Sequence, residues 1–269
     1  MKVALVDNGS LEPAAHESLR SAARSIGEIA GVSVEAVSWR HSGRIAAREL
    51  GGSPAWTLAP WIRTRVSEGE REFVLLPFFI SPQGAIGSLL RRDLEALRAS
   101  TGGFEYSFVP GLAEGPALPG IVASRVRDAA AGMQRPSVVV VDHGGPSPAS
   151  AAVRDRVADG VRAILGADIG ALMAASMESP DGPEFGFNRP LLSEVLERPG
   201  LRAVVIAPLF LSPGRHAGPG GDLARIAREA RERSPLLRCH FAELVGSHPA
   251  AAEFLAGALA DVLQEEARI

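Results

Sequence analysis

The segment Val204-Val-Ile-Ala-Pro-Leu-Phe-Leu-Ser-Pro213 repeats an earlier part of the same chain, Phe73-Val-Leu-Leu-Pro-Phe-Phe-Ile-Ser-Pro82. A second pair shows the same relation, because Ala4-Leu-Val-Asp-Asn-Gly-Ser10 returns as Val139-Val-Val-Asp-His-Gly-Gly145. Paired positions lie roughly 130 residues apart, so each copy fills about half of the 269-residue chain. This spacing is too long for a solenoid and predicts two similar domains of ordinary size.

Each copy alternates short apolar runs with segments of helical spacing. The predicted strands cover residues 3–6, 34–39, 73–76, 104–109, 137–141, 169–175, 203–207 and 238–244. The predicted helices cover residues 14–29, 55–67, 89–99, 118–131, 149–165, 189–196, 223–233 and 250–265. This alternation predicts an α/β fold of two Rossmann-like parallel-sheet lobes, related by internal duplication. We place the lobes at residues 1–134 and 135–269 and expect ligands in a cleft between them.

Composition restricts the possible functions of the chain. The formal net charge of −3 gives no reason to expect nucleic acid or an anionic membrane as a partner. Lys2 is the only lysine, and the arginine bias fits either carboxylate recognition or a GC-rich genome. Cys239 is the only cysteine, which excludes an intrachain disulfide and a thiolate metal cluster. We find no signal peptide and no apolar run of about 20 residues, and therefore expect a cytoplasmic protein.

Three polar residues stand at or just after the ends of predicted strands in the second half. His143 is followed by two glycines, Glu178 precedes Pro180, and His216 lies in a loop rich in glycine and proline. Two imidazoles and a carboxylate suit borderline ions such as Fe²⁺, Co²⁺ or Zn²⁺. Each residue alone is more often a loop or capping residue. Because all three face one edge of one sheet, we predict that they form a metal site with open coordination positions.

The repeat provides an internal control for this prediction. The first copy has Asn8 in place of His143, Arg40 in place of Glu178 and, in an ungapped register, Ala85 in place of His216. The scaffold is therefore duplicated, but the candidate ligands are not. This asymmetry favours chemistry in the second lobe and substrate binding or support in the first.

The second half resembles the class II tetrapyrrole chelatases, in particular the sirohydrochlorin cobalt and iron chelatases of the CbiX type. Val140-Val-Asp-His-Gly-Gly145 resembles the family's histidine-glycine turn, and Ser176-Met-Glu178 resembles its glutamate at a strand end. Pro208-Leu-Phe-Leu-Ser-Pro-Gly-Arg-His216 resembles its apolar strand, glycine and metal-binding histidine. Placing the complete set in the second lobe is similar to protohaem ferrochelatases.

This resemblance implies a metal chelatase, a lyase that inserts Co²⁺ or Fe²⁺ into a sirohydrochlorin-type tetrapyrrole in cobalamin or sirohaem biosynthesis. His143 and His216 would be neutral metal ligands, and Glu178 would balance charge and accept a pyrrole proton. Neutral imidazole is needed for ligation, so activity should fall as pH drops through the histidine range near about 6.5.

We expect the substrate-binding residues to be Arg215, Gly144, Gly214 and Arg40. The arginines would pair with carboxylates of the tetrapyrrole, and the glycines would let the backbone approach its ring. No prosthetic group is expected, because the divalent metal is a substrate. The expected partners are a tetrapyrrole but neither nucleic acid nor membrane, and the chain would be a monomer or a homodimer.

Two other functions remain open at this point. The chain could be a chelatase-derived protein that binds a tetrapyrrole or a metal without turnover, which the altered first copy favours. It could also be a two-lobed small-molecule receptor of the periplasmic type, although we find no export signal.

Overall fold

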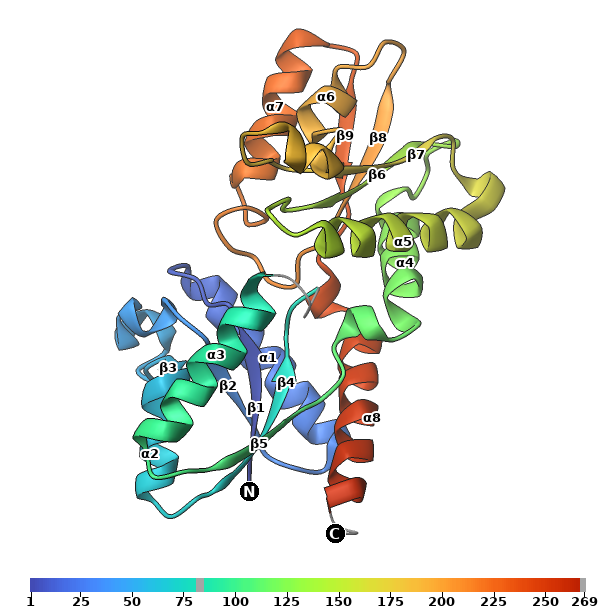
Figure 1. Cartoon of the computed structure of the whole chain (residues 1–269). Coiled ribbons are helices and arrows are strands. Elements are labelled where there is room, and N and C mark those ends of the chain that lie inside the picture. Colours follow the sequence, from blue (N-terminus) through green and yellow to red (C-terminus); the bar gives the residue numbers. More distant parts are fainter. Residues whose placement is uncertain (81–84, 267–269) are drawn as a thin grey trace. The chain divides into compact units, whose positions relative to one another are not determined.

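A computed structural model describes residues 1–80 and 85–266 and confirms the predicted fold class of two parallel-sheet α/β regions (Figure 1). The chain forms two compact units. Unit 1 consists of Met1–Gly115 with Pro249–Ile269, and unit 2 consists of Pro116–His248. Residues 81–84, which include the repeated Ser81-Pro82, lie outside the described residues.

Unit 1 contains a five-stranded parallel sheet of order β3-β2-β1-β4-β5. Its strands are β1 Lys2–Asp7, β2 Val34–Ser38, β3 Trp56–Thr57, β4 Glu72–Pro77 and β5 Glu105–Phe108. Its helices are α1 Pro13–Ala30, α2 Leu58–Ser67, α3 Ala85–Ser100 and α8 Pro249–Glu266, with short 3₁₀ turns at Ser42–Arg44, Ala47–Leu50 and Leu112–Glu114.

Unit 2 contains a four-stranded parallel sheet of order β7-β6-β8-β9. Its strands are β6 Ser137–Asp142, β7 Leu172–Ser176, β8 Ala203–Pro208 and β9 Arg238–Phe241. Its helices are α4 Ala117–Ala129, α5 Pro148–Leu165, α6 Leu192–Leu196 and α7 Asp222–Arg233, with 3₁₀ turns at Gly166–Asp168, Pro183–Asn188 and Val245–Ser247.

Continuous apolar runs form the central strands because helices cover both faces of a parallel sheet. Val138, Val139, Val140 and Val141 are all completely buried in β6. In unit 1, Trp61 is a packing residue, since it is fully buried and packs edge-on against Phe73 with ring centroids 5.4 Å apart. Burial of such side chains contributes about 1.5 to 3 kcal/mol each.

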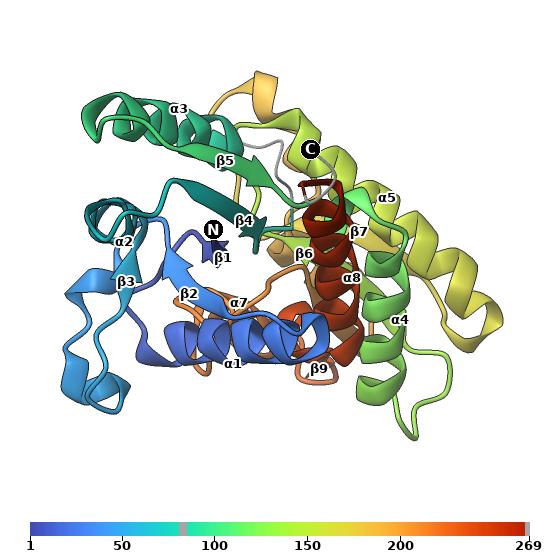
Figure 2. The ribbon, with the colours of Figure 1, turned by 90° about the horizontal axis from the view of Figure 1, so that it is seen from below.

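The last helix of each sequence copy packs on the first helix of the other copy. α4 ends the first half of the sequence but packs against α5 in unit 2, and α8 ends the chain but packs against α1 in unit 1 (Figure 2). The compact units therefore divide the chain at different points from the sequence halves 1–134 and 135–269.

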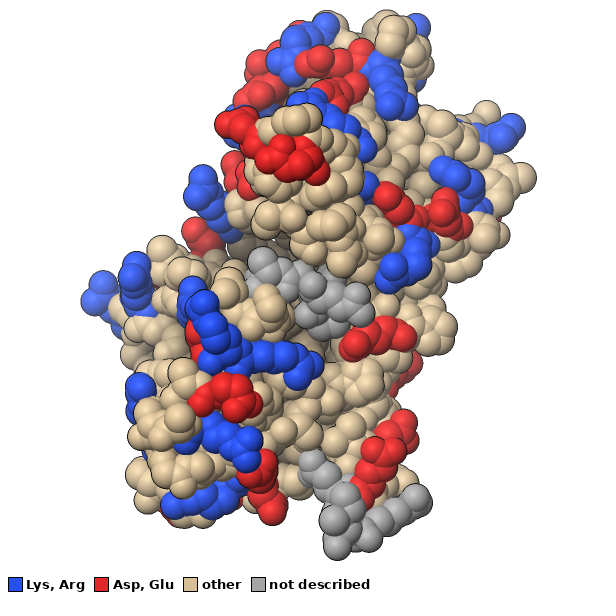
Figure 3. Space-filling model, viewed as in Figure 1, with Lys and Arg blue, Asp and Glu red and all other residues tan. Residues whose placement is uncertain are grey.

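The surface of unit 2 carries both signs of charge. In the view of Figure 3, basic and acidic side chains are interspersed over this unit, in agreement with the small net charge of −3. No helix in the described part of the chain has the length and apolar character needed to cross a membrane.

Candidate metal and substrate site

Three neighbouring strands of unit 2 bring the predicted ligands to one edge of the sheet. β6 lies between β7 and β8, and all three run parallel. His143 directly follows β6, Glu178 lies two residues beyond β7, and His216 lies in the loop between β8 and α7. Since the carboxyl ends of parallel strands share an edge, this order places the three side chains together.

The structure brings these side chains into contact. The imidazole rings of His143 and His216 lie edge to face, with centroids 4.6 Å apart and planes at 82°. His143 Nε2 lies 3.5 Å from Glu178 Oε1. The side chains of His143, Glu178 and His216 are 45%, 60% and 30% exposed, so a ligand can reach all three from solvent.

His143 presents an unshared electron pair to a carboxylate. Its Nδ1 lies 3.0 Å from the carbonyl oxygen of Gly144, which can only accept a hydrogen bond, so Nδ1 carries the proton. When the ring is neutral, Nε2 carries a lone pair, and it lies 3.5 Å from Glu178 Oε1. Two electron-rich atoms at this distance repel each other, and a proton or a metal cation between them removes the repulsion.

Asp222, which our sequence interpretation did not select, orients the second histidine. Its Oδ2 accepts a hydrogen bond from His216 Nδ1 at 2.7 Å. This bond lowers the pKa of Asp222, against a smaller opposing effect of burial. With the hydrogen on Nδ1, Nε2 of His216 is free to bind a cation, the arrangement that carboxylate–histidine pairs give metal sites. The repeat contained a hint, because it aligns Asp222 with Asp93.

The predicted ligands contact one another in pairs and do not surround a common metal position. Among residues 1–80 and 85–266, no group of three or more His, Cys, Asp or Glu side chains is placed to hold one metal ion. His143 contacts both Glu178 and His216, but the donor atoms do not yet face one point. Side-chain rotations would be needed for the three residues to bind one ion.

Gly144 is required by the turn that places His143. Its φ of +84° is in the left-handed region, and a Cβ there would lie 1.9 Å from the carbonyl oxygen of Glu178. The close approach exists because Glu178 N donates to His143 O at 3.1 Å. Gly144 thus fixes the distance between the backbones that carry two predicted ligands.

The first copy has the same backbone turn with other side chains. Gly9 has φ +87°, and a Cβ there would lie 1.7 Å from the carbonyl oxygen of Arg40. Arg40 N donates to Asn8 O at 3.1 Å, as Glu178 N does to His143 O. The structure therefore confirms the pairing of Asn8 with His143 and of Arg40 with Glu178. Ala85 begins α3, and its side chain is outside the described residues.

Tightly packed glycines shape the loop that carries His216. Gly218 N donates to Gly214 O at 2.7 Å, and a Cβ on Gly218 would lie 2.7 Å from that oxygen. A Cβ on Gly221 would approach the carbonyl oxygens of Arg215 and His216 at 2.5 and 2.8 Å. The Arg215 side chain is 82% exposed, with Nε 3.7 Å from Asp222 Oδ2, so most of its donors face solvent.

Arg40, the predicted contribution of the first copy, is held in place within unit 1. Its guanidinium stacks over the Trp39 ring at 3.9 Å and donates to Asp93 Oδ2 at 2.7 Å. The hydrogen bond from Arg40 lowers the pKa of Asp93, against a smaller opposing effect of burial. The Arg40 side chain remains 45% exposed, so it is both oriented and accessible.

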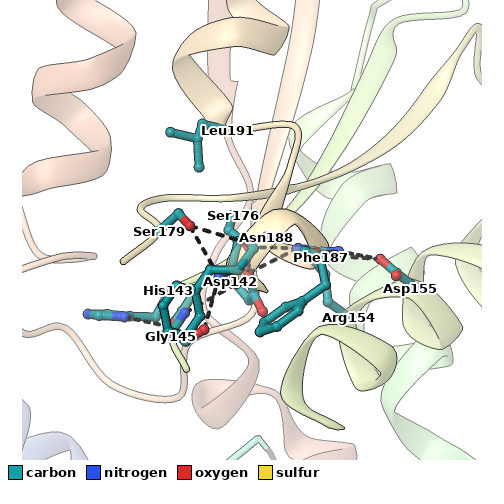
Figure 4. A network of polar contacts seen from close by, with 12 residues as sticks. Asp142, His143, Gly145, Arg154, Asp155, Ser176, Ser179, Phe187, Asn188 and Leu191 are labelled. Carbon is teal, nitrogen blue, oxygen red and sulfur yellow. Dashed lines mark hydrogen bonds and ion pairs between the residues drawn. The ribbon is translucent and has the colours of Figure 1, made fainter. Parts of the chain in front are cut away.

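A buried polar network supports the His143 turn from behind (Figure 4). Arg154 of α5, with its side chain 3% exposed, donates to Ser176 Oγ at 2.6 Å, and Ser176 Oγ donates to Asp142 Oδ1 at 2.6 Å. Burial raises the pKa of Asp142, opposed by the Ser176 hydrogen bond and the Arg154 charge. Sequence analysis missed this network, because its members are far apart in the chain and have ordinary local patterns.

Comparison with known proteins confirms the resemblance to the chelatase class. Residues 137–262, the region that holds all three predicted ligands, match the CbiX family model. A search of curated proteins finds no match to the chain.

Solved structures of similar fold include SirB from Bacillus subtilis with Fe³⁺, with a TM-score of 0.68 and 14% identity, covering 96% of this chain and 94% of that one. SirB from Bacillus subtilis subspecies spizizenii, a sirohydrochlorin chelatase in complex with cobalt, gives the same values. CbiX, the terminal enzyme of sirohaem biosynthesis in denitrifying bacteria, has a TM-score of 0.65 and 16% identity, covering 96% of this chain and 98% of that one.

Proposed function

We propose that this chain inserts a divalent metal, Co²⁺ or Fe²⁺, into a sirohydrochlorin-type tetrapyrrole. The observation that carries the proposal is the contact of His143 with both His216 and Glu178 at the carboxyl ends of three adjacent strands. The match of this region to the CbiX family and the SirB and CbiX folds support the same reaction class.

Metal insertion releases two pyrrole protons and needs a partly dehydrated ion beside the macrocycle. In our proposal, Nε2 of His143 and Nε2 of His216 bind the metal as neutral donors. Glu178 balances the charge of the ion and accepts a proton, which it can pass to water because its side chain is 60% exposed. A general base of this kind typically contributes about 10²- to 10⁴-fold to the rate.

Substrate binding in this proposal uses the two accessible arginines. Arg215 and Arg40 each retain donors that can pair with the acidic substituents of the tetrapyrrole. Gly144 and Gly214 shape the turns beside His143 and His216, which lets the backbone come close to the ring.

The test is multiple-turnover insertion of Co²⁺ and Fe²⁺ into sirohydrochlorin by the purified chain, followed by the change in visible absorbance. We expect His143→Ala and His216→Ala each to lose about 10²-fold or more in kcat/KM, because each removes a metal donor. His240→Ala is the matched control, since His240 is an exposed histidine on β9 of the same unit.

Two outcomes would contradict the proposal. Wild-type chain that binds sirohydrochlorin or metal in a 1:1 ratio without turnover would show a binding protein. Near-normal rates in both histidine variants would show that the metal is handled elsewhere. The comparison of Co²⁺ with Fe²⁺ as substrates identifies the preferred metal.

A further inference from the structure

Arg154 occupies a position where the duplicated fold does not need an arginine. α1 and α5 both begin at a proline, have 18 residues and follow the paired β1 and β6 turns, which aligns Arg154 with Leu19. Leu19 is fully buried in unit 1, and Arg154 is almost fully buried in unit 2. A buried arginine is costly unless all its partners are well placed, whereas leucine satisfies the same position by packing. The arginine therefore serves something that unit 1 lacks.

Apart from Asp155, its neighbour on α5, the partners of Arg154 belong to segments next to the candidate metal ligands. Its guanidinium donates to Ser176 Oγ at 2.6 Å and to the carbonyl oxygen of Phe187 at 3.0 Å. It lies 3.7 Å from Asp142 Oδ1, on the residue before His143. The planar guanidinium thus joins the ends of β6 and β7 to the loop of residues 179–190.

The loop of residues 179–190 is hydrogen-bonded to the His143 turn through Asn188. Asn188 is 1% exposed, its Oδ1 accepts from Gly145 N at 3.2 Å, and its Nδ2 donates to Gly145 O at 2.9 Å. The amide therefore pairs with both backbone groups of a residue two positions from His143. Figure 4 shows Arg154, Phe187, Asn188 and Gly145 forming one continuous chain of contacts toward His143.

We infer that Arg154 is a positioning residue that fixes the His143 turn for metal binding, by holding the Phe187–Asn188 segment against Gly145. The inference rests on the proposed function, since it assumes that His143 binds the metal. It explains why, among the described residues, the one almost fully buried arginine lies in the copy that has the ligands. Arg154 does not touch the metal or the macrocycle.

The matched pair of variants is Arg154→Leu and Arg162→Leu in the full chain. Arg154→Leu installs the residue that the first copy carries at this position. Arg162 lies on the same helix and also binds a backbone carbonyl, that of Leu172 at the opposite end of β7. Both variants replace an arginine of α5 with leucine. Arg154→Leu does so next to the His143 turn, and Arg162→Leu does so far from it.

We expect Arg154→Leu to weaken Co²⁺ binding, measured by calorimetric titration without macrocycle, by about 10- to 100-fold, the effect typical of residues that orient a metal ligand. In the insertion assay KM for Co²⁺ should rise while KM for sirohydrochlorin stays within about twofold, because only the metal donor is displaced. The Co²⁺ affinity of Arg154→Lys should lie between those of the wild type and Arg154→Leu. An ammonium group cannot bond to the acceptors on Ser176, Phe187 and Asp142 at once. Arg162→Leu should match the wild type.

Three outcomes would overturn the inference. Arg154→Leu could bind Co²⁺ as tightly as the wild type, or Arg162→Leu could lose as much Co²⁺ affinity as Arg154→Leu. In Arg154→Leu, the KM values for Co²⁺ and for sirohydrochlorin could also rise equally. If Arg154→Leu does not fold, Asn188→Ala replaces it, because this variant keeps the ion pair and removes both bonds to Gly145. Wild-type Co²⁺ affinity in Asn188→Ala would equally overturn it. Wild-type chain that binds Co²⁺ but does not insert it would contradict the proposed function alone, since the titration still tests Arg154.

Discussion

At the scale of single residues, the two candidate ligand histidines are oriented by different means. A backbone carbonyl sets the tautomer of His143, whereas the Asp222 carboxylate sets that of His216. A carboxylate fixes the ring more strongly than a neutral carbonyl and makes the imidazole a better donor. His216 is therefore the more firmly prepared of the two, and His143 depends on the support behind its turn.

Asp222→Ala should reduce kcat/KM for metal insertion by about 10- to 100-fold, because His216 loses the partner that orients it. Asp222→Asn keeps an oxygen that can accept from Nδ1 and should lose less. Steady-state rates with thermal unfolding midpoints measure both effects. Equal losses in the two variants would show that charge, and not orientation, is the contribution of Asp222.

Burial raises the pKa of the aspartates at the ends of β1 and β6, but only Asp142 of β6 lies beside a buried arginine. Burial raises the pKa of Asp7 from 3.8 to about 6, and its Oδ1 has no hydrogen-bond partner among the described residues. Its ionisation therefore opposes folding: the stability of the native state is unaffected below about pH 4 and falls as pH rises toward 6, by about 3 kcal/mol in total. Asp7→Asn should raise the unfolding free energy by about this amount at pH 7.5 and hardly change it at pH 4.

Asp142→Asn is the control for that experiment. It removes the carboxylate beside buried Arg154, which keeps only the exposed Asp155 as an ion-pair partner in the described contacts. We expect a loss of about 1 to 3 kcal/mol at pH 7.5. Urea unfolding at both pH values measures the difference, and a gain of stability in Asp142→Asn at pH 7.5 would show that buried Arg154 does not need the Asp142 carboxylate.

At the scale of elements, the contact of α4 with α5 depends on a glycine. A Cβ on Gly160 of α5 would lie 2.7 Å from Cβ of Pro119 on α4. Gly160→Ala improves helix propensity by about 1 kcal/mol, but the clash should outweigh this and lower stability by about 1 to 3 kcal/mol. Gly120→Ala, on α4 with open space around the new methyl group, should raise stability instead. Chemical unfolding of both variants tests this.

Much of the fold could be predicted from the sequence, because buried parallel strands appear in it as continuous apolar runs. The predicted strand 203–207 corresponds to β8, Ala203–Pro208. The two-residue β3, Trp56–Thr57, was missed, since our pattern began a helix at Ala55. Pairing between so few residues is set by the neighbouring strand and leaves no periodic pattern of its own.

The candidate site was predicted in part. The proximity of His143, Glu178 and His216 was predicted because topology alone places strand ends together, and their role as metal ligands stays a prediction. Arg154 and Asn188 were missed because their function lies in contacts with residues distant in the chain, such as Asn188 with Gly145. Such partners depend on side-chain directions, which a sequence pattern does not contain.

The packing of α4 and α8 could not be predicted from the sequence either. α4 and α8 have similar positions in the two copies, and α1 and α5 offer them similar surfaces. Local pattern cannot decide between packing within a copy and packing across copies. The structure shows the second arrangement for both helices.

At the scale of the whole molecule, the compact units predict which fragments fold. Unit 2 is one continuous segment, Pro116–His248, and includes α4. A fragment of residues 116–248 should fold and show dispersed amide signals by NMR. A fragment of residues 135–248 should not, because it lacks the buried apolar side chains of α4: Leu118, Ile121, Val122, Ala123 and Val126. Equal folding of both fragments would show that α4 is dispensable.

Because α4 packs in unit 2 and α8 packs in unit 1, the two units are completed at different points during translation. Unit 2 has all its residues once position 248 has been synthesised, whereas unit 1 still needs α8, which lies later in the chain. The α8-binding surface of α1 therefore stays uncovered until α8 has been synthesised. Unit 1 begins before unit 2 in the chain, yet unit 2 is the first of the two to be complete.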